Sequence, residues 1–158
     1  MITVIMAMLM QTDHPPLVQE INAYRKQHNL PALTFNPQLQ LSAYHHARDM
    51  AANNTLSHAG SDGSDFSTRA RKSGFDMTSG GEIIAPTDDP KEAVRMWSQS
   101  PGHNSQMLDN SRTYFGAASY MGYSCAVFGN IGMVGNTVNI NQPLPVPTGK
   151  PRRKSRIR

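Results

Sequence analysis

The chain has 158 residues, 38% of them hydrophobic and 16% charged, which fits one domain of ordinary size with a modest core. No run of about 18 apolar residues occurs, which excludes a transmembrane helix, and the single cysteine, Cys125, excludes an internal disulfide framework. The formal net charge of only +4 argues against a wholly disordered chain.

The first ten residues, MITVIMAMLM, form an apolar N-terminal arm that we extend to residue 14. Their length matches the apolar part of a signal peptide, but no Lys or Arg precedes them and no small-residue cleavage site follows before Gln11. The arm is therefore either a trimmed signal remnant, or a strand or hydrophobic arm that docks on a neighbouring chain.

Two longer helices are predicted in the first third of the chain. The first runs from residue 16 to about residue 28, where Leu17, Ile21 and Tyr24 recur on one helical face. The second begins at Asn36-Pro37, an N-cap followed by proline in the first turn, and should end near residues 53–54.

Shorter elements follow the polar loop 59–65. Asp65 could cap a short helix that stops at Gly74, and Gly80-Gly81 introduces a short strand over residues 82–85. Residues 88–90 begin another helix by the same logic of cap and proline. That helix should end at residues 101–102, and a further helical turn should cover residues 104–108.

Strand character dominates after residue 110. Residues 114–120 and 124–128 are short, aromatic and separated by Met121-Gly122-Tyr123, which predicts a β-hairpin, and residues 131–140 could add a strand. Helices followed by strands predict a single α+β domain with helices packed on a small antiparallel sheet.

The positive charge is concentrated in the last nine residues. Residues 142–158 form a proline-rich linker and a basic tail, KPRRKSRIR, which begins at Lys150 and holds six of the fifteen basic residues. The other 149 residues carry nine basic and eleven acidic groups, a net charge of −2. The tail is either a solvated end or a binding segment for an acidic partner or nucleic acid.

Residues 17–129 carry an ordered set of short motifs. They are Asn22-Ala23-Tyr24-Arg25, His28-Asn29-Leu30-Pro31-Ala32-Leu33, Asn36-Pro37-Gln38-Leu39, Ala43, His46-Ala47, Asp49-Met50-Ala51, Leu56-Ser57-His58, Gly81-Glu82, Ala93-Val94, Trp97 and Ser100-Pro101-Gly102-His103. The set resembles the CAP superfamily of cysteine-rich secretory proteins, antigen 5 and pathogenesis-related 1 proteins, and is most similar to its short, cysteine-poor bacterial branch. The resemblance implies an α-β-α sandwich, with a CAP/SCP domain over residues 15–141.

In that superfamily two histidines and one or two glutamates face a shared cleft. The pattern maps onto His58, Glu82 and His103, so the resemblance implies that these three side chains converge. Ser57 and Gly102 would let the backbone turn beside each histidine, placing it at the end of an element. The structural alternative is that each histidine simply holds its own loop or helix start by hydrogen bonds.

Two imidazoles and a carboxylate offer two kinds of chemistry. The side chains of His58, His103 and Glu82 could bind a divalent metal such as zinc with an open position. Glu82 could instead orient a histidine that acts as a general base near neutral pH.

Two features weigh against catalysis. Many eukaryotic members have a second glutamate shortly after the tryptophan, whereas Ser98, Gln99 and Ser100 follow Trp97 here. No nucleophile is evident either, since Ser57 is merely a chain neighbour of His58.

Several other residues are expected to be structural. Cys125 in its predicted strand should be a buried thiol, and Trp97 should belong to the core. His45 and His46 point about 100° apart on a helix, so at most one of them faces the core or cleft, with surface exposure as the default.

Three functions remain open. The first is a non-enzymatic binding or structural module, because superfamily members have been linked to binding of lipid-like ligands. The second is a component of a larger assembly, such as a virion or envelope complex, in which the arm and the tail of this chain bind neighbouring molecules. The third is a hydrolase-like or metal-dependent enzyme using His58, Glu82 and His103. A secreted, cell-envelope or virion location is favoured over the cytoplasm.

Overall fold

The structure, a computed structural model, describes residues 14–132. Its elements in chain order are α2 (Pro16–Gln27), β1 (Thr34–Phe35), α3 (Pro37–Asn53), α4 (Phe66–Lys72), β2 (Met77–Ala85), α5 (Pro90–Ser98), α6 (Pro101–Leu108), β3 (Tyr114–Tyr120) and β4 (Tyr123–Ile131). The N-terminal arm up to residue 13, the strand expected beyond residue 132, the proline-rich linker and the basic tail lie outside the described residues. Within residues 14–132, no helix has the length and apolar character needed to span a membrane.

The helix starts follow the capping chemistry of the sequence. The Asn36 side chain accepts hydrogen bonds from the amides of Gln38 and Leu39, each at 3.0 Å, and Asp65 and Asp89 cap α4 and α5 in the same way. Each side chain satisfies amide groups that the first turn leaves without partners.

One helix boundary was predicted wrongly. Pro101 begins α6 instead of ending α5, with Ser100 at the N-cap position. Proline lacks an N–H, which the first turn of a helix does not need, so it suits a helix start as well as a stop.

The sheet has the strand order β1-β3-β4-β2. The three longer strands are antiparallel, and β3 and β4 form the predicted hairpin, in which Phe115 pairs with Phe128. The two-residue strand β1 pairs in parallel with β3, so the sheet is mixed and not purely antiparallel. Parallel neighbours need a crossover connection, and the whole segment between Phe35 and Tyr114 provides it.

Strand β2 is longer than the sequence predicted. It begins at Met77, and Gly80 and Gly81 lie within it, paired with Gly129 and Phe128 of β4. A Cβ atom at Gly81 would collide with the side chain of Gln106 in α6. Glycine at this position therefore allows α6 to lie close against β2, and does not interrupt the strand.

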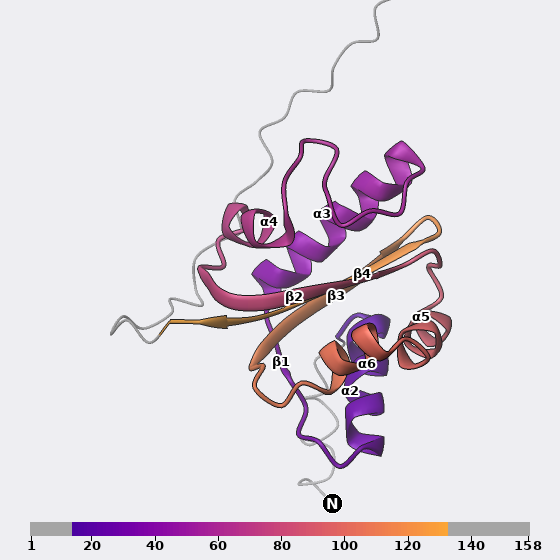
Figure 1. Ribbon diagram of the computed structural model, residues 1–158, viewed down its shortest axis with the longest axis vertical. Coiled ribbons are helices and arrows are strands. Elements are labelled where there is room, and N and C mark those ends of the chain that lie inside the picture. Colours follow the sequence, from indigo (N-terminus) through magenta and orange to yellow (C-terminus); the bar gives the residue numbers. More distant parts are fainter. Residues whose placement is uncertain (1–13, 133–158) are drawn as a thin grey trace, which may run out of the picture.

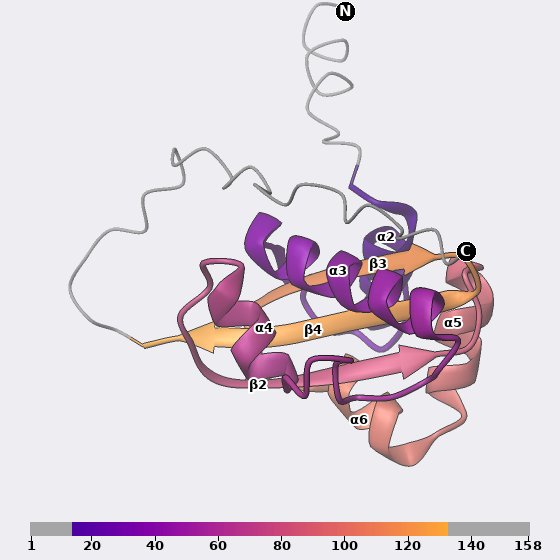
Figure 2. The same ribbon diagram turned by 90° about the horizontal axis from the view of Figure 1, so that it is seen from above.

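The molecule has three layers. Figure 1 shows α3 and α4 above the sheet and α2, α5 and α6 below it, and Figure 2 shows α3 lying along β3 and β4. The architecture is thus the expected α+β sandwich of helices, sheet and helices. Helix α3 approaches β3 closely, because a Cβ atom at Gly116 would collide with the α3 backbone at Gln40.

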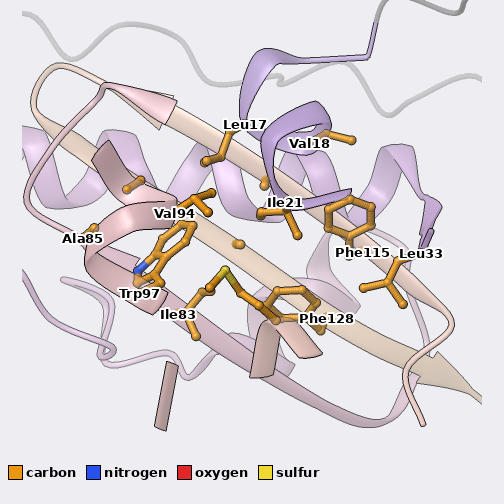
Figure 3. Close-up of a cluster of buried hydrophobic side chains, with 14 residues drawn as sticks. Leu17, Val18, Ile21, Leu33, Ile83, Ala85, Val94, Trp97, Phe115 and Phe128 are labelled. Carbon is orange, nitrogen blue, oxygen red and sulfur yellow. The ribbon is translucent and has the colours of Figure 1, made fainter. Parts of the chain in front are cut away.

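The sheet separates two hydrophobic clusters. Below it, toward α2, α5 and α6, Trp97, Phe115 and Phe128 are buried (Figure 3), and the Trp97 indole donates a 2.9 Å hydrogen bond to the Ile84 carbonyl. Above it, α3 and α4 cover a second cluster that includes Ile84 and the buried Cys125. Successive side chains of a strand point to opposite faces, so Glu82 shares the upper face with Ile84.

Candidate functional site

The three residues singled out by sequence come from different layers. His58 lies in the loop between α3 and α4, and His103 lies in the first turn of α6, on the other side of the sheet. Glu82 lies inside β2, not at an element end, and β2 is an edge strand of the sheet. The loop and α6 therefore approach β2 from its two faces.

His58 and Glu82 are in direct contact. The Nδ1 atom of His58 lies 3.0 Å from the Oε1 atom of Glu82. The histidine side chain is 57% exposed, whereas that of the glutamate is only 1% exposed. The buried carboxylate thus fixes the orientation of an accessible imidazole, whose Nε2 atom forms no hydrogen bond with residues 14–132.

Arg69 of α4 holds the other side of the Glu82 carboxylate. Its Nη2 atom lies 2.7 Å from Glu82 Oε2 and also donates to the His58 carbonyl at 3.0 Å. Its Nη1 atom donates to the Ser64 carbonyl at 2.6 Å. One guanidinium therefore ties the loop after His58 to the carboxylate that orients the imidazole.

His46 of α3 closes this cluster from above. Its side chain is buried, and its Nε2 atom lies 2.8 Å from the Ser57 carbonyl and 3.7 Å from Glu82 Oε1. Burial lowers the His46 pKa despite the charge of Glu82, so the ring is neutral at pH 7 and its contact with Glu82 is not an ion pair.

The default of surface exposure therefore holds for His45 and was wrong for His46. His46 belongs to the buried stripe of α3 that includes Leu39, Ala43 and Met50, while His45 is exposed. The two rings point in different directions, as adjacent positions on a helix require.

The electrostatics of the cluster keep Glu82 ionised. Burial raises its pKa, but the hydrogen bond with His58 and the charge of Arg69 outweigh burial and leave the pKa below its ordinary value. The same hydrogen bond raises the pKa of His58 against the opposing effect of burial. A carboxylate that would resist ionisation in an apolar core is thereby charged at neutral pH.

Cys125 also reaches this carboxylate. Its thiol lies 3.6 Å from Glu82 Oε2 and is completely buried. Burial raises the pKa of Cys125 well above its ordinary value, and the charge of Glu82 adds to the effect. The thiol is consequently protonated, as expected of a structural cysteine.

The side chain of His103 is half-buried and forms no hydrogen bond with residues 14–132. Burial lowers its pKa, and the charge of His58 lowers it further. The charge of one imidazole therefore acts on the protonation of the other. That His58, Glu82 and His103 line one cleft remains a prediction.

Glu82 does not fit the role of a direct metal ligand. His58 engages its Oε1 atom, and Arg69 and Cys125 engage Oε2. Within residues 14–132, no group of three or more His, Cys, Asp or Glu side chains is arranged to hold a metal ion. The carboxylate fits instead the role of a group that orients a ligating or hydrogen-bonding histidine.

The layers and this cluster define an α+β sandwich domain with a buried glutamate behind a loop histidine. The family model of CAP, the cysteine-rich secretory protein family, matches residues 18–132, and the chain belongs to this family.

Relatives of known structure agree with this assignment. An extracellular protein containing an SCP domain from Bacillus anthracis str. Ames is 27% identical, with a TM-score of 0.68 over 73% of this chain and 39% of that one. An outer surface protein from Borrelia burgdorferi shares the fold, with 24% identity and a TM-score of 0.64 over 72% of this chain and 88% of that one.

A curated relative is similar in sequence. The uncharacterized membrane protein YlbC of Bacillus subtilis (strain 168) is 28% identical over 106 residues, which are 66% of this chain and 31% of that protein. The chain therefore corresponds to about a third of this relative and to well under half of the Bacillus anthracis protein.

Proposed function

We propose that the chain is a non-enzymatic binding domain of the CAP family, whose ligand enters a cleft lined by His58 and His103 at the edge of β2. The supporting observation is the contact between His58 and Glu82, with Arg69 bound to the opposite carboxylate oxygen. In this arrangement the Glu82 carboxylate holds one accessible imidazole, that of His58, in place. A prepositioned imidazole favours binding, because less side-chain freedom is lost when a ligand arrives.

The surrounding hydroxyl and thiol groups favour binding over covalent catalysis. The Ser57 hydroxyl accepts a 3.1 Å hydrogen bond from the Ala59 amide, and neither Ser57 nor Cys125 has a side-chain hydrogen bond with His58. A nucleophile that His58 could activate would need such a hydrogen bond, or one through a water molecule. The contacts therefore support a recognition role for His58.

The two imidazoles would recognise the polar end of the ligand. His58 Nε2 and both ring nitrogens of His103 are without hydrogen-bond partners among residues 14–132. They can donate to a carboxylate, and they can donate to or accept from a hydroxyl group. A small lipid-like molecule with such a head group is the ligand class that we propose.

Titration with decanoate, followed by calorimetry, tests this proposal on the full chain. We expect binding that His58→Ala or His103→Ala weakens by about tenfold each, the value of roughly one charge-assisted hydrogen bond. His28→Ala is the matched control, because His28 is an exposed histidine at the end of α2. Equal binding by all four proteins, or no binding by any, would contradict the proposal.

Zinc binding is a second candidate function. The observation that favours it is that Glu82 occupies Nδ1 of His58, an arrangement typical of histidines that bind metal through their other nitrogen. His58 and His103 would be the protein ligands, and Glu82 would orient His58. A bound zinc ion would supply Lewis-acid chemistry, which is the route by which a hydrolase-like activity could arise.

Calorimetry with zinc chloride tests this candidate separately. Wild type should bind zinc with an affinity that falls as pH decreases through the histidine range, because protons compete for the imidazoles. His58→Ala should remove the heat and His28→Ala should keep it. The same absence of heat in wild type and His58→Ala would eliminate the zinc site.

The names of the relatives bear on where the domain acts. One relative is described as extracellular and another as a membrane protein. We propose that this chain also acts outside the cytoplasm, in the secreted or cell-envelope fraction. Fractionation of cells that express the chain, with blotting of each fraction, tests the location, and recovery only in the cytosol would contradict it.

The two ends could connect the domain to an assembly. The basic tail carries six positive charges on a chain that is otherwise at −2, so it should dominate any binding to nucleic acid or another polyanion. Deleting residues 150–158 should abolish such binding and flatten its salt dependence. Deleting residues 1–10 should weaken self-association with little salt effect, because that segment is uncharged. If both deletion variants bind polyanions and self-associate as the full chain does, the two ends have no role in assembly.

A further inference from the structure

A second surface feature lies on the outer side of α3. A hollow of about 490 Å³ is lined by His45, Arg48, Asp49 and Ala52 of α3 and by Tyr120 and Met121 at the turn between β3 and β4. His45 and Arg48 are exposed, whereas the neighbouring His46 is buried against Glu82. Helix α3 therefore separates this hollow from the His58–Glu82 contact.

Arg48 lines the hollow and lies beside two tyrosine rings. Its Cζ atom lies 5.8 Å from the centre of the Tyr44 ring and 6.0 Å from that of Tyr120. The two rings contact each other edge to face, with centres 5.8 Å apart. A guanidinium held against two aromatic rings loses less side-chain freedom when it binds than a freely rotating one.

The guanidinium also keeps its hydrogen-bonding capacity. The Arg48 guanidinium forms no hydrogen bond or ion pair with any of residues 14–132, although Asp49 is the next residue in the chain. Asp49 has other partners: its Oδ2 accepts from the Ser61 amide at 2.8 Å, and its Oδ1 from the Ser61 hydroxyl at 2.5 Å and from Asn53 at 3.1 Å. All side-chain N–H donors of Arg48 thus remain for a ligand, and two of them can donate in parallel to two oxygens of a carboxylate or phosphate.

The other residues that line the hollow suit the apolar part of a ligand. Met121 is 71% exposed and lies in the turn between β3 and β4, with a positive φ of 41°. Methionine is flexible and polarizable and adapts to ligands of different shape. Together with Ala52 and the ring of Tyr120, it gives the hollow an apolar wall beside the charged group.

We infer that this hollow is a binding site for a small ligand that joins an oxyanion, phosphate or carboxylate, to an apolar body. Arg48 grips the oxyanion, and Tyr120, Met121 and Ala52 contact the body. The site is separate from the one proposed for His58 and His103. Decanoate has the chemistry that either site would bind, and the variants separate the two: His58→Ala and His103→Ala act on the first site and Arg48→Ala on the second, so either proposal can fail while the other stands.

Phenyl phosphate is a suitable probe, because it combines the two features in one soluble molecule. Calorimetry on the full chain should show binding that Arg48→Ala weakens at least about tenfold, the loss expected for one bidentate contact to an oxyanion. Arg48→Lys should retain part of the affinity, since lysine keeps the positive charge but lacks the planar pair of N–H donors that makes a bidentate contact. Met121→Ser should weaken the binding of phenyl phosphate but not that of inorganic phosphate.

Two controls separate this site from general effects. Arg95→Ala removes an exposed arginine from α5, on the opposite layer, and should leave binding unchanged. His58→Ala should leave it unchanged too, which distinguishes this site from the proposed cleft. Thermal melting of each variant verifies folding, and the exposed Arg48 should be replaceable without loss of the fold.

Vesicles of phosphatidylcholine with and without phosphatidylglycerol form the second arm of the test. Arg48-dependent binding to the anionic vesicles alone would identify the oxyanion as a lipid head group. Arg48-dependent binding to phenyl phosphate would identify a free ligand. Absence of binding in both arms, or equal binding by wild type and Arg48→Ala, would overturn the inference.

Discussion

The two faces of the sheet are stabilised in different ways. The face toward α2, α5 and α6 buries large aromatic and aliphatic side chains around Trp97 (Figure 3). The face toward α3 and α4 combines smaller apolar groups with a buried carboxylate, Glu82, and its partners Arg69 and His46. Both faces also bury a charge: below the sheet, the Arg25 guanidinium of α2 donates to backbone carbonyls. The buried charge above the sheet differs because it is a carboxylate, which acid can neutralise.

This difference assigns separate tasks to the two faces. Apolar packing hardly depends on pH, so the lower cluster should stabilise the fold to the same extent at acid and neutral pH. Charge-assisted hydrogen bonds have strict geometry, and here they hold the loop that carries His58. The site is therefore attached to the fold by a part of the core whose stability depends on pH.

The largest effect should come from the apolar face. Trp97→Ala should lower the free energy of unfolding by about 3–5 kcal/mol, because it leaves a cavity in the lower cluster. It also leaves the Ile84 carbonyl without its indole donor. Urea denaturation at pH 5 and pH 7 should give the same loss. A loss that changes strongly with pH would break the contrast between the faces.

The next largest effect should come from Glu82→Gln. Removing one partner of a buried ion pair leaves Arg69 uncompensated and should cost about 3 kcal/mol at pH 7. Because the folded pKa of Glu82 is lowered, its charged form stabilises the protein above the ordinary pKa of 4.5. That stabilisation is lost as pH falls through the lower, folded value.

Urea titrations of wild type and variant at several pH values check this expectation. The difference between them should be full at pH 7 and should shrink toward acid pH. Glu92→Gln is the matched control, since Glu92 forms an exposed ion pair with Arg95 and should show little effect. A difference that is constant with pH would contradict an ionised Glu82.

A smaller and more local effect is expected at Arg69. Arg69→Met should release the loop 58–65, because Arg69 donates to the carbonyls of His58 and Ser64. Hydrogen exchange should become about tenfold faster in that loop and stay unchanged in α2, which lies on the other face. Equal exchange in wild type and Arg69→Met would show that the loop is held by other contacts.

The double variant Arg69→Met/Glu82→Leu should be more stable than Arg69→Met alone, because it leaves no unpaired buried charge.

The smallest effect should come from His58→Ala. Its side chain is 57% exposed, so the loss should be below about 1 kcal/mol. The raised pKa of His58 means that the charged pair stabilises fully below pH 6.5 and fades as pH rises through the higher, folded value. Comparing melting of both proteins at pH 5.5 and pH 9 checks the sign, and a larger loss at pH 9 would contradict it.

The sequence predicted the local features of the fold well. Asn36, Asp65 and Asp89 cap the helices that they were expected to cap, because capping depends on a few neighbouring residues. The hairpin around Met121-Gly122 was also predicted from local turn chemistry. Gly80-Gly81 was misread as a boundary, because both glycines are explained by tertiary contacts: Gly81 by the approach of α6, and Gly80 by the Met77 side chain and the Phe128 carbonyl.

The charged cluster shows where such prediction ends. The family resemblance pointed to His58 and Glu82, which are in contact in the structure. Nothing in the sequence marked Arg69, which looks like an ordinary basic residue near the end of a short helix. The stripe of α3 could have indicated a buried His46, but not its partner. These contacts join α3, α4 and β2, so they depend on tertiary packing and not on spacing along the chain.

The central claim is that an ionised, buried Glu82 holds His58 in place, and ring NMR of the histidines tests it most directly. In wild type, His58 should titrate above 6.5 and His103 below it, as the hydrogen bond to Glu82 and the burial of His103 require. In Glu82→Gln, the pKa of His58 should fall while the domain stays folded at pH 7. A His58 titration that is identical in the two proteins would contradict the account.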